Sequence, residues 1–509
     1  MSKRVAVIGA GFAGLSTGKL LKNLGYDVTI YEKDAEVGGV WASSRRYPGL
    51  GTQNPGSTYA LSEHPMPKKY PEWPSGEQMQ TYFESYVDRF GFRDIIRFKT
   101  EVVNAEYDHG TWTINTRETS SGKNGEEDVE YFDFLIVCNG IFSSPKIPHF
   151  DGSQEWVESG RKIMHTSDFL DINDVKDKKV VVIGYGKSSC DAANSIAKKA
   201  KETHVVARKI IWKVPKKIGG IINFKHLFLT RLGEGLFPYI ELKGFDKVIH
   251  GVGKPVRKML LTAIGGIISR QLNFKKCGLY PYGPLETIAR TSISLATDGF
   301  FEKVENGSIA VHRDTQISKL SDGVVYLANG EKIEADIIIA GTGFHQEIPF
   351  FNKDLMQKVT KENGDFKLYK QVIPVGVPGL AFVGYNSSFF SQLSCETAAM
   401  FVSEYMRGGL NLPSTQEQEK YVEKRLEWAK ERTNGNYFKG TYIVPFSLRQ
   451  MDELLDMMNL KLSKFTRFMQ WFFVVDPSKY SVLYKELEKR NEVNKTVIKG
   501  VGLHEEVGR

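Results

Sequence analysis

Cysteine is scarce in this chain, since only four of its 509 residues are cysteines. They lie far apart, so the sequence has no Cys-x-x-Cys pair, no Cys-x4-Cys redox pair and no spacing typical of a metal site. The pattern indicates buried or free thiols in a reducing compartment, and we expect no metal centre. The four positions are Cys138, Cys190, Cys277 and Cys395.

Long apolar runs are missing as well. The best stretch, residues 259–269, is about half the ~20 residues that a membrane-spanning helix needs. No signal peptide precedes the first apolar segment, which begins within a few residues of Met1. We therefore predict no transmembrane span and a cytoplasmic location, with peripheral contact at a membrane surface as an alternative.

A strong charge imbalance is also lacking. The net charge of +8 is modest for this length, and no basic-aromatic motif accompanies it, so we expect no nucleic-acid partner. Hydrophobic residues make up 41% of the chain and charged residues 25%, which suits an enzyme with two or more domains and sizeable cores.

A glycine-rich loop follows the first apolar strand, residues 5–8. Gly9 makes a tight turn, Gly11 lets the backbone approach a pyrophosphate, and Gly14 lets the next helix pack on the strand. The helix then presents its N-terminal amides to the phosphates. Glu32 ends the next strand, where an acid accepts hydrogen bonds from ribose hydroxyls. The candidate residues are Gly9, Gly11, Phe12, Ala13, Gly14, Glu32 and Lys33.

The same order of parts recurs 175 positions later, at Gly184. Ser189 stands where the third glycine would be, so we expect this helix to pack less closely on its strand. The acid is replaced by Arg208 and Lys209, and Arg208 can bind the 2′-phosphate of NADPH bidentately. Lys209 could instead be a solvated strand-end charge. The candidate residues are Gly184, Gly186, Lys187, Ser188, Ser189, Arg208 and Lys209.

The order of predicted elements indicates an α/β protein with two Rossmann-like dinucleotide-binding domains, the second inserted in the first. We predict the first domain at 1–170 and 331–445, and the second at 171–330 with an irregular insertion near 214–281. Residues 446–509 are predicted to be a helical C-terminal extension. A buried strand is expected at 335–340 in the returning part of the first domain.

Together these motifs resemble the flavin-dependent monooxygenases with two dinucleotide domains, which include flavin-containing and Baeyer–Villiger monooxygenases. The resemblance covers roughly residues 1–400. It implies that the first domain binds FAD and the second binds NADPH. It also implies that residues 384–396 carry a helix N-terminus to the flavin ring. The further cofactor candidates are Gly39, Val40, Trp41, Thr52, Gly341, Thr342, Gly343 and Gln392.

The fingerprint between the two domains departs from the family pattern, which is Phe-x-Gly-x3-His-x3-Tyr/Phe, or Trp-Pro in the Baeyer–Villiger branch. His165 and Phe169 keep their spacing, but the leading Phe is absent and Gly160 is displaced by one residue. Phe169 in place of Trp-Pro favours the heteroatom-oxidising branch. His165 is more readily explained as a structural histidine between domains than as a reacting group.

The resemblance also implies a catalytic amide. The stretch from Tyr47 resembles the Baeyer–Villiger branch, yet the acid of that branch would fall at Gln53. Heteroatom oxidisers usually have Thr-Asn beside the flavin, whereas here Thr52 precedes Gln53 and Asn54. Gln53 and Asn54 are therefore the catalytic candidates. Asn54 could instead only turn the chain before Pro55.

The predicted function is an NADPH- and FAD-dependent monooxygenase. Such an enzyme forms a flavin hydroperoxide and transfers one oxygen atom from molecular oxygen to a small lipophilic substrate. Oxygenation of nitrogen or sulfur is favoured because it needs no strong catalytic acid or base. Baeyer–Villiger oxidation of ketones and an uncoupled NADPH oxidase or flavin reductase are the alternatives.

Two apolar stretches lie outside the nucleotide motifs, at 259–264 and 469–475. We expect burial in a core or in a homodimer contact. A membrane interface or an access path for lipophilic substrate is the alternative for each.

Overall fold

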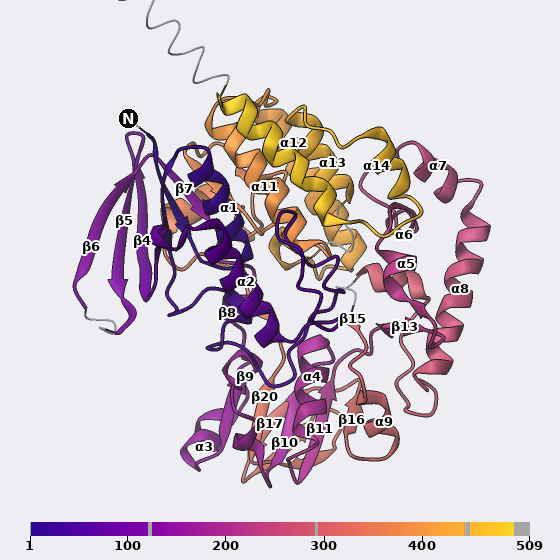
Figure 1. The fold of residues 1–509 in the computed structure, drawn as a ribbon. Coiled ribbons are helices and arrows are strands. Elements are labelled where there is room, and N and C mark those ends of the chain that lie inside the picture. Colours follow the sequence, from indigo (N-terminus) through magenta and orange to yellow (C-terminus); the bar gives the residue numbers. More distant parts are fainter. Residues whose placement is uncertain (1, 121–124, 291–293, 442, 444–447, 493–509) are drawn as a thin grey trace, which may run out of the picture.

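A computed structural model describes residues 2–120, 125–290, 294–441, 443 and 448–492. Two five-stranded parallel sheets dominate the fold (Figure 1). The first has the order β24-β7-β1-β2-β3. Its strands are β1 (Arg4–Ile8), β2 (Asp27–Tyr31), β3 (Ile96–Arg97), β7 (Phe134–Val137) and β24 (Leu380–Phe382). Their continuous apolar runs suit strands covered on both faces.

The second sheet has the order β16-β11-β10-β20-β9 and lies at the bottom of Figure 1. Its strands are β9 (Lys162–His165), β10 (Lys179–Ile183), β11 (Glu202–Ala207), β16 (Ala310–Arg313) and β20 (Ile337–Ala340). Each dinucleotide loop leads from a central strand into a helix, α1 (Phe12–Asn23) after β1 and α4 (Lys187–Ile196) after β10. The predicted α/β fold class with two Rossmann-like units is confirmed.

Sheet membership differs from the predicted boundaries at 170/171 and 330/331. β9 lies before residue 170 and β20 after residue 330, yet both pair in the second sheet. The strand expected at 335–340 in the first domain is thus β20 beside β10. An apolar run such as Ile337–Ala340 suits either buried sheet equally well, so its sequence does not reveal its neighbours.

Smaller antiparallel sheets flank the two units. One contains β4 (Thr100–Asp108), β5 (Thr111–Glu118) and β6 (Glu127–Phe132), and another contains β17 (Ile317–Ser321), β18 (Val324–Leu327) and β19 (Lys332–Glu334). The polar stretch at 120–128, which the sequence predicts as a hairpin tip, lies partly outside the described residues. Short two-stranded pairs are formed by β8 (Ser144–Pro145), β12 (Lys213–Val214), β13 (Lys217–Ile218), β14 (Ile222–Asn223), β15 (Ser294–Leu295), β21 (Phe344–His345), β22 (Leu368–Tyr369) and β23 (Ile373–Pro374).

Helices cover the sheets and build the insertion. The first unit has α2 (Gly76–Phe90), α10 (Lys353–Val359) and α11 (Ser391–Met406), and the second has α3 (Ser153–Glu158) and α9 (Phe300–Glu305). The insertion contains α5 (Phe224–Phe228), α6 (Arg231–Gly235), α7 (Phe245–His250) and α8 (Lys254–Gln271). Beyond these come α12 (Thr415–Thr433), α13 (Leu448–Met457) and α14 (Lys464–Met469).

The C-terminal helices pack on the first unit rather than forming a separate body. Leu454 and Tyr484 are fully buried in the same apolar core as Val5 and Leu20. In Figure 1 these helices (yellow) lie above α11 and next to the insertion on the right. Among the described residues no helix is long and apolar enough to cross a membrane.

Candidate functional site

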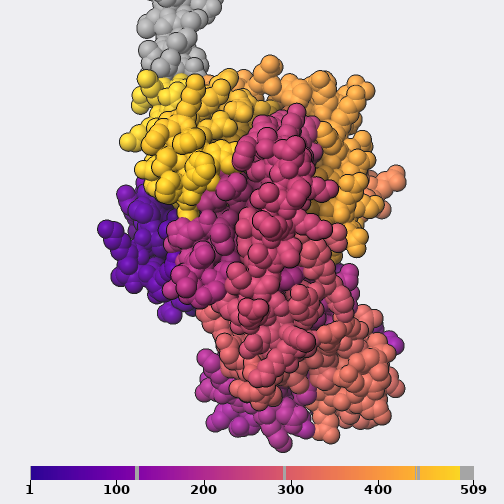
Figure 2. Space-filling view, turned by 90° about the vertical axis from the view of Figure 1, so that its right-hand side faces the viewer, coloured from indigo at the N-terminus to yellow at the C-terminus, as the bar shows by residue number. Residues whose placement is uncertain are grey.

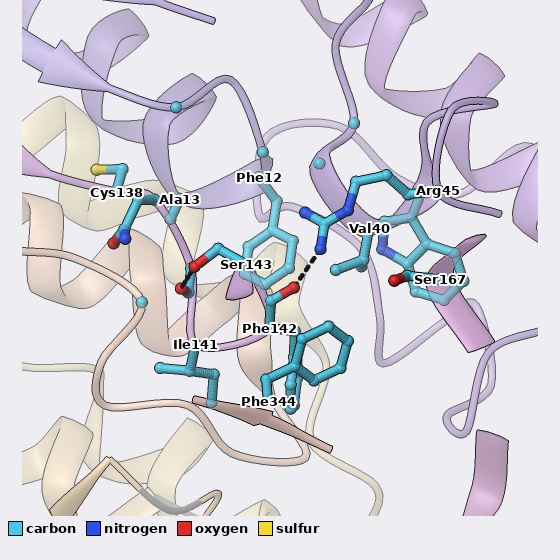
Figure 3. A pocket seen from close by; sticks show the side chains of 18 of the residues that line it. Phe12, Ala13, Val40, Arg45, Cys138, Ile141, Phe142, Ser143, Ser167 and Phe344 are labelled. Atoms are coloured by element: carbon cyan, nitrogen blue, oxygen red, sulfur yellow. Dashed lines mark hydrogen bonds between the residues drawn. The ribbon is translucent and has the colours of Figure 1, made fainter. Parts of the chain in front are cut away.

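A cavity of about 650 Å³ opens where the carboxyl ends of the first sheet face the start of α4 (Figure 3). In parallel α/β sheets this edge is where ligands bind. The first unit supplies most of its wall, and Lys187 and Ser188 come from the second loop. Of the predicted residues, the cavity is lined by Gly9, Gly11, Phe12, Ala13, Glu32, Lys33, Gly39, Val40, Trp41, Gln53, Asn54, Lys187 and Ser188.

At two positions of the first loop only glycine fits. Gly9 has φ +106°, and a Cβ there would lie 2.7 Å from the carbonyl oxygen of Cys138. A Cβ on Gly14 would lie 1.8 Å from the carbonyl oxygen of Gly9, so α1 packs directly on the turn. Gly11 is different, because its nearest neighbour would be Gly39 Cα at 3.8 Å. Because Gly11 has no side chain, space is left open in the cavity next to it, whereas Gly9 and Gly14 allow close packing of the protein itself.

Glu32 is held in place by backbone amides. It is 7% exposed, and its carboxylate accepts hydrogen bonds from Ala10 N (2.6 Å) and Asp34 N (2.9 Å). Burial raises the pKa of Glu32, and these two hydrogen bonds oppose that rise. Glu32 lines the cavity, and each of its carboxylate oxygens has accepting capacity left, which suits a ribose diol.

The second loop has room for the Ser189 side chain, whereas a Cβ at the equivalent Gly14 would lie 1.8 Å from Gly9 O, so α4 packs less closely on its turn than α1, as expected. The Ser189 side chain is fully buried, and its hydroxyl lies 3.2 Å from the carbonyl oxygens of both Ile183 and Gly341. A Cβ on Gly184 would lie 2.7 Å from Gly341 O. The serine therefore fits because its hydroxyl satisfies a strand-end carbonyl.

Lys187 of the second loop pairs with Asp191, and Asp191 in turn contacts residues of both units. The Lys187 ammonium pairs with the buried Asp191 carboxylate, which also accepts a hydrogen bond from Thr297 Oγ1. Tyr47 of the first unit places its hydroxyl 3.5 Å from Asp191 Oδ2. The lysine charge at the cavity is thus partly neutralised, and α4 is tied to the chain around Tyr47.

Arg208 and Lys209 follow β11 at the same edge of the second sheet, outside the cavity. Both side chains are exposed, and neither has an ion-pair partner within the described part of the chain. Two free cations at this strand end leave a site for an anionic group.

Asn54 is buried, and in the described chain only one of the two polar groups of its side-chain amide has a hydrogen-bond partner. Its Nδ2 donates a hydrogen bond to the carbonyl oxygen of Phe389, just before α11. Its Oδ1 is buried and has no hydrogen-bond partner among the described residues, and the same is true of Thr52 Oγ1. Gln53 lines the same wall, and its Oε1 accepts a hydrogen bond from Leu295 N at 3.4 Å. An unpaired buried acceptor costs free energy unless a ligand supplies a donor.

Several predicted cofactor residues lie behind the cavity wall rather than in it. Gly341, Thr342 and Gly343 form the turn after β20, where Gly341 N donates to Ile183 O (2.9 Å) and Gly343 O accepts from Lys146 N (3.0 Å). Gln392 is fully buried in the first turn of α11, whose Ser391 does line the cavity. Gly14, Gly184, Gly186, Ser189 and Thr52 are also outside the lining.

His165 is a buried packing group. Its Nδ1 accepts a hydrogen bond from Ser167 N (3.1 Å), and its ring meets Phe344 edge-on at 4.7 Å. Burial lowers the pKa of His165, so the imidazole is neutral at physiological pH. This position agrees with a structural role between the two units.

Sequence reasoning missed part of the cavity wall. Arg45 donates a hydrogen bond to Phe142 O across the cavity mouth, and Phe142 packs against Phe344 at 5.5 Å (Figure 3). Burial lowers the pKa of Arg45. No motif spacing marks Arg45 or Ile141, because their positions depend on how the loops after η1 (Gly39–Trp41) and β7 meet in space.

Comparison with known proteins agrees with this architecture. The pattern of the flavin-binding monooxygenase-like family matches residues 2–484. The chain belongs to this family. It is 24% identical to "Probable flavin-containing monooxygenase 1" of Arabidopsis thaliana, over 90% of this chain and 92% of that protein.

Two solved structures share the fold. S-allyl-L-cysteine S-oxygenase from Allium sativum superposes with a TM-score of 0.62 at 21% identity, covering 97% of this chain and 98% of the other. Cyclohexanone monooxygenase from Rhodococcus sp. Phi1, bound to NADP⁺, gives 0.64 at 18% identity, covering 90% and 98%. Family membership confirms the predicted enzyme class, an NADPH-dependent flavin monooxygenase, and its cofactors FAD and NADPH.

Proposed function

We propose that this enzyme transfers one oxygen atom to nitrogen or sulfur of a small lipophilic substrate. The observation that carries the proposal is the neutral character of the wall formed by residues 50–59 and 384–391. Its polar side chains are amides and hydroxyls, and the carboxylates that line the cavity, Glu32, Asp34 and Glu101, come from the ribose end. Oxygen transfer to a soft heteroatom needs no general base, whereas ketone oxidation needs a deprotonated oxidant and a cation. The cations that line the cavity, Arg45 and Lys187, lie outside this wall, and they are bound to Phe142 O and to Asp191.

Asn54 is the amide that we place against the flavin. Its NH₂ group is committed to Phe389 O, which fixes the direction of the amide and leaves Oδ1 as an acceptor. Bound flavin, after reduction by NADPH, supplies the oxygen chemistry. A neutral acceptor at this position can hold an N–H or O–H group without removing its proton. Gln53 lies farther along the same wall, toward Leu295.

The two loops are proposed to hold the two cofactors. The amides after Gly11 face the FAD pyrophosphate at the start of α1, with Glu32 and Lys33 beside the ribose. Gly39, Val40 and Trp41 lie across from Gly11 and flank the flavin half of the cavity. In the second unit Gly184, Gly186, Lys187, Ser188 and Ser189 form the pyrophosphate turn of NADPH, and Arg208 with Lys209 takes its 2′-phosphate. Gly341, Thr342, Gly343, Thr52 and Gln392 are proposed to support these groups from behind.

Aromatic and aliphatic side chains complete the cavity and make it suitable for a lipophilic substrate. Phe12, Ile141, Phe142 and Phe344 surround the region in Figure 3, and Phe350 and Phe389 extend it. Such a lining excludes water, which limits wasteful release of hydrogen peroxide.

The test is a substrate panel. Purified enzyme with NADPH is given an alkyl aryl sulfide, a tertiary amine and a cyclic ketone, and each product is quantified by mass together with NADPH consumed and hydrogen peroxide released. We expect sulfoxide or N-oxide to account for most of the NADPH. Efficient lactone formation with poor sulfoxidation would move the enzyme to the ketone branch. Peroxide release alone with all three would favour an oxidase.

A further inference from the structure

Helix α8 has two apolar faces, of which only one is covered. Leu261, Ile264 and Ile268 recur at helical spacing and are buried in the main core. Val256, Met259 and Ile267 also recur at helical spacing, and they are 64%, 67% and 47% exposed. An amphipathic helix of a water-soluble protein carries polar residues on its outer face. The outer face of α8 instead carries these three apolar side chains, over about 17 Å between Val256 and Ile267.

A second group of exposed apolar side chains lies next to it in the fold. Phe465, Phe468 and Phe472 come from α14 and the turn after it, and they are 72%, 60% and 62% exposed. Trp471 of this turn packs edge-on against Phe245 of α7 at 5.6 Å, so α14 meets the start of the α7–α8 segment. Figure 1 shows α7, α8 and α14 together along the right-hand side, and Figure 2 faces that side.

Most of the charge around these side chains is positive, although Lys243, Arg257 and Lys276 pair with Glu241, Glu286 and Glu305. Residues 243–280 contain eight lysines and arginines and a single acidic residue, Asp246, which is buried and paired with Arg449. Residues 463–474 add Lys464, whereas Arg467 of this stretch pairs with Asp452 of α13. Cations therefore border the apolar surface, and Lys254 and Lys258 of α8 are exposed beside it.

We infer that this surface, the exposed apolar side chains of α8 and α14 with their flanking lysines, rests on an anionic lipid bilayer. Phenylalanines and methionine enter the headgroup–acyl boundary, while lysines reach lipid phosphates. The helix lies flat, because no helix of the described chain is long and apolar enough to span. A protein partner or a second copy of the chain would not require such a one-sided basic border. This inference does not depend on the substrate of the enzyme.

The experiment is vesicle flotation of the full-length, FAD-loaded protein. One set of vesicles is phosphatidylcholine alone, and the other contains phosphatidylglycerol as well. We expect flotation with the anionic vesicles, weakening as salt is raised, and little with the neutral ones. The triple variant Phe465→Ser, Phe468→Ser, Phe472→Ser should lose flotation because the apolar anchor is gone. The pair Lys254→Glu, Lys258→Glu should weaken binding by more than roughly thirtyfold, because each lost lysine contributes on the order of 1 kcal/mol and each new glutamate repels the anionic lipid.

Matched controls use side chains that are exposed on other elements. The triple variant Val129→Ser, Tyr131→Ser, Val157→Ser changes residues that are 47%, 58% and 54% exposed on β6 and α3. The pair Lys353→Glu, Lys358→Glu makes the same charge change on α10, where both lysines are exposed. Both controls should float like the unaltered protein, and all variants should retain FAD.

Two results would overturn the inference. One is that the unaltered protein stays unbound with anionic and neutral vesicles alike. The other is a dimer, seen by light scattering, that the phenylalanine variant dissociates while vesicle binding is absent. The latter would assign this surface to a contact between copies of the chain.

Discussion

At the scale of single residues, Gly11 and Gly186 occupy equivalent places in the two loops and form a matched pair. A Cβ on Gly11 would have its nearest contact at 3.8 Å, and one on Gly186 would meet nothing within 4 Å. Neither has a positive φ, so alanine should fold at both positions. We expect Gly11→Ala to yield colourless protein, because the methyl group would occupy the place that we propose for the FAD pyrophosphate. Gly186→Ala should stay yellow and raise KM for NADPH. Stoichiometric flavin in Gly11→Ala would refute the first assignment.

Arg208 decides, in our proposal, between NADPH and NADH. The side chain is exposed, so the contact with the 2′-phosphate is partly screened and contributes about 1 kcal/mol, less than a shielded charge-assisted bond. Arg208→Ala should raise KM for NADPH roughly fivefold and leave that for NADH nearly unchanged. Lys209→Ala is the control that measures the second cation. Steady-state kinetics with both coenzymes make the comparison, and equal effects would show that Arg208 does not discriminate.

At the scale of elements, α11 carries a buried acid whose titration reports on its packing. Burial raises the pKa of Glu396 to about 7, opposed by hydrogen bonds from Ser62 and Tyr484. The folded state therefore binds a proton that the unfolded chain has already lost above its ordinary pKa of 4.5. Stability from this group is fully present below pH 4.5 and is lost as pH rises through about 7, a change of roughly 3 kcal/mol.

The variant Glu396→Gln removes this titration and keeps an acceptor for Ser62. We expect its melting temperature to depend less on pH between 4.5 and 7 than that of the unaltered protein. Thermal melts across this interval provide the measurement. An identical pH profile in both proteins would show that Glu396 does not titrate there.

The elements also show where sequence reasoning reaches its limit. The two loops were predictable because strand, glycines and terminal charge lie within about 25 residues of one another, and local geometry requires each of them. The strand β20 was predicted in the first domain but pairs in the second sheet, because strand pairing across more than 150 positions leaves no local signal. The hydrogen bond from Ser189 to Gly341 O joins residues 152 positions apart, so local sequence could not predict it. Arg45 was missed for the same reason, because its place in the cavity wall depends on a hydrogen bond to Phe142 O, 97 residues away.

At the scale of the whole molecule, Asp452 of α13 binds arginines from two segments that lie far apart in the sequence. Its carboxylate accepts bonds from the buried Arg231 of α6, at 2.6 and 2.9 Å, and from Arg467 of α14 at 3.2 Å. Arg467 lies in α14, which forms part of the apolar surface, and Arg231 lies in α6, which precedes α7 and α8. This one side chain therefore joins the insertion and α14 on the same side of the fold.

Asp452→Ala leaves Arg231 buried without its carboxylate, and we expect a loss of roughly 3 kcal/mol in stability. The flavin site should be spared, because Asp452 does not line the cavity. Limited proteolysis should therefore become faster within residues 236–280 while the protein remains yellow. Glu423→Ala is the control, since its pair with Lys361 is exposed and should contribute about 0–1 kcal/mol. Loss of FAD together with faster proteolysis would mean that the insertion and the flavin site unfold as one unit, and unchanged proteolysis would mean that the insertion is held by its apolar contacts alone.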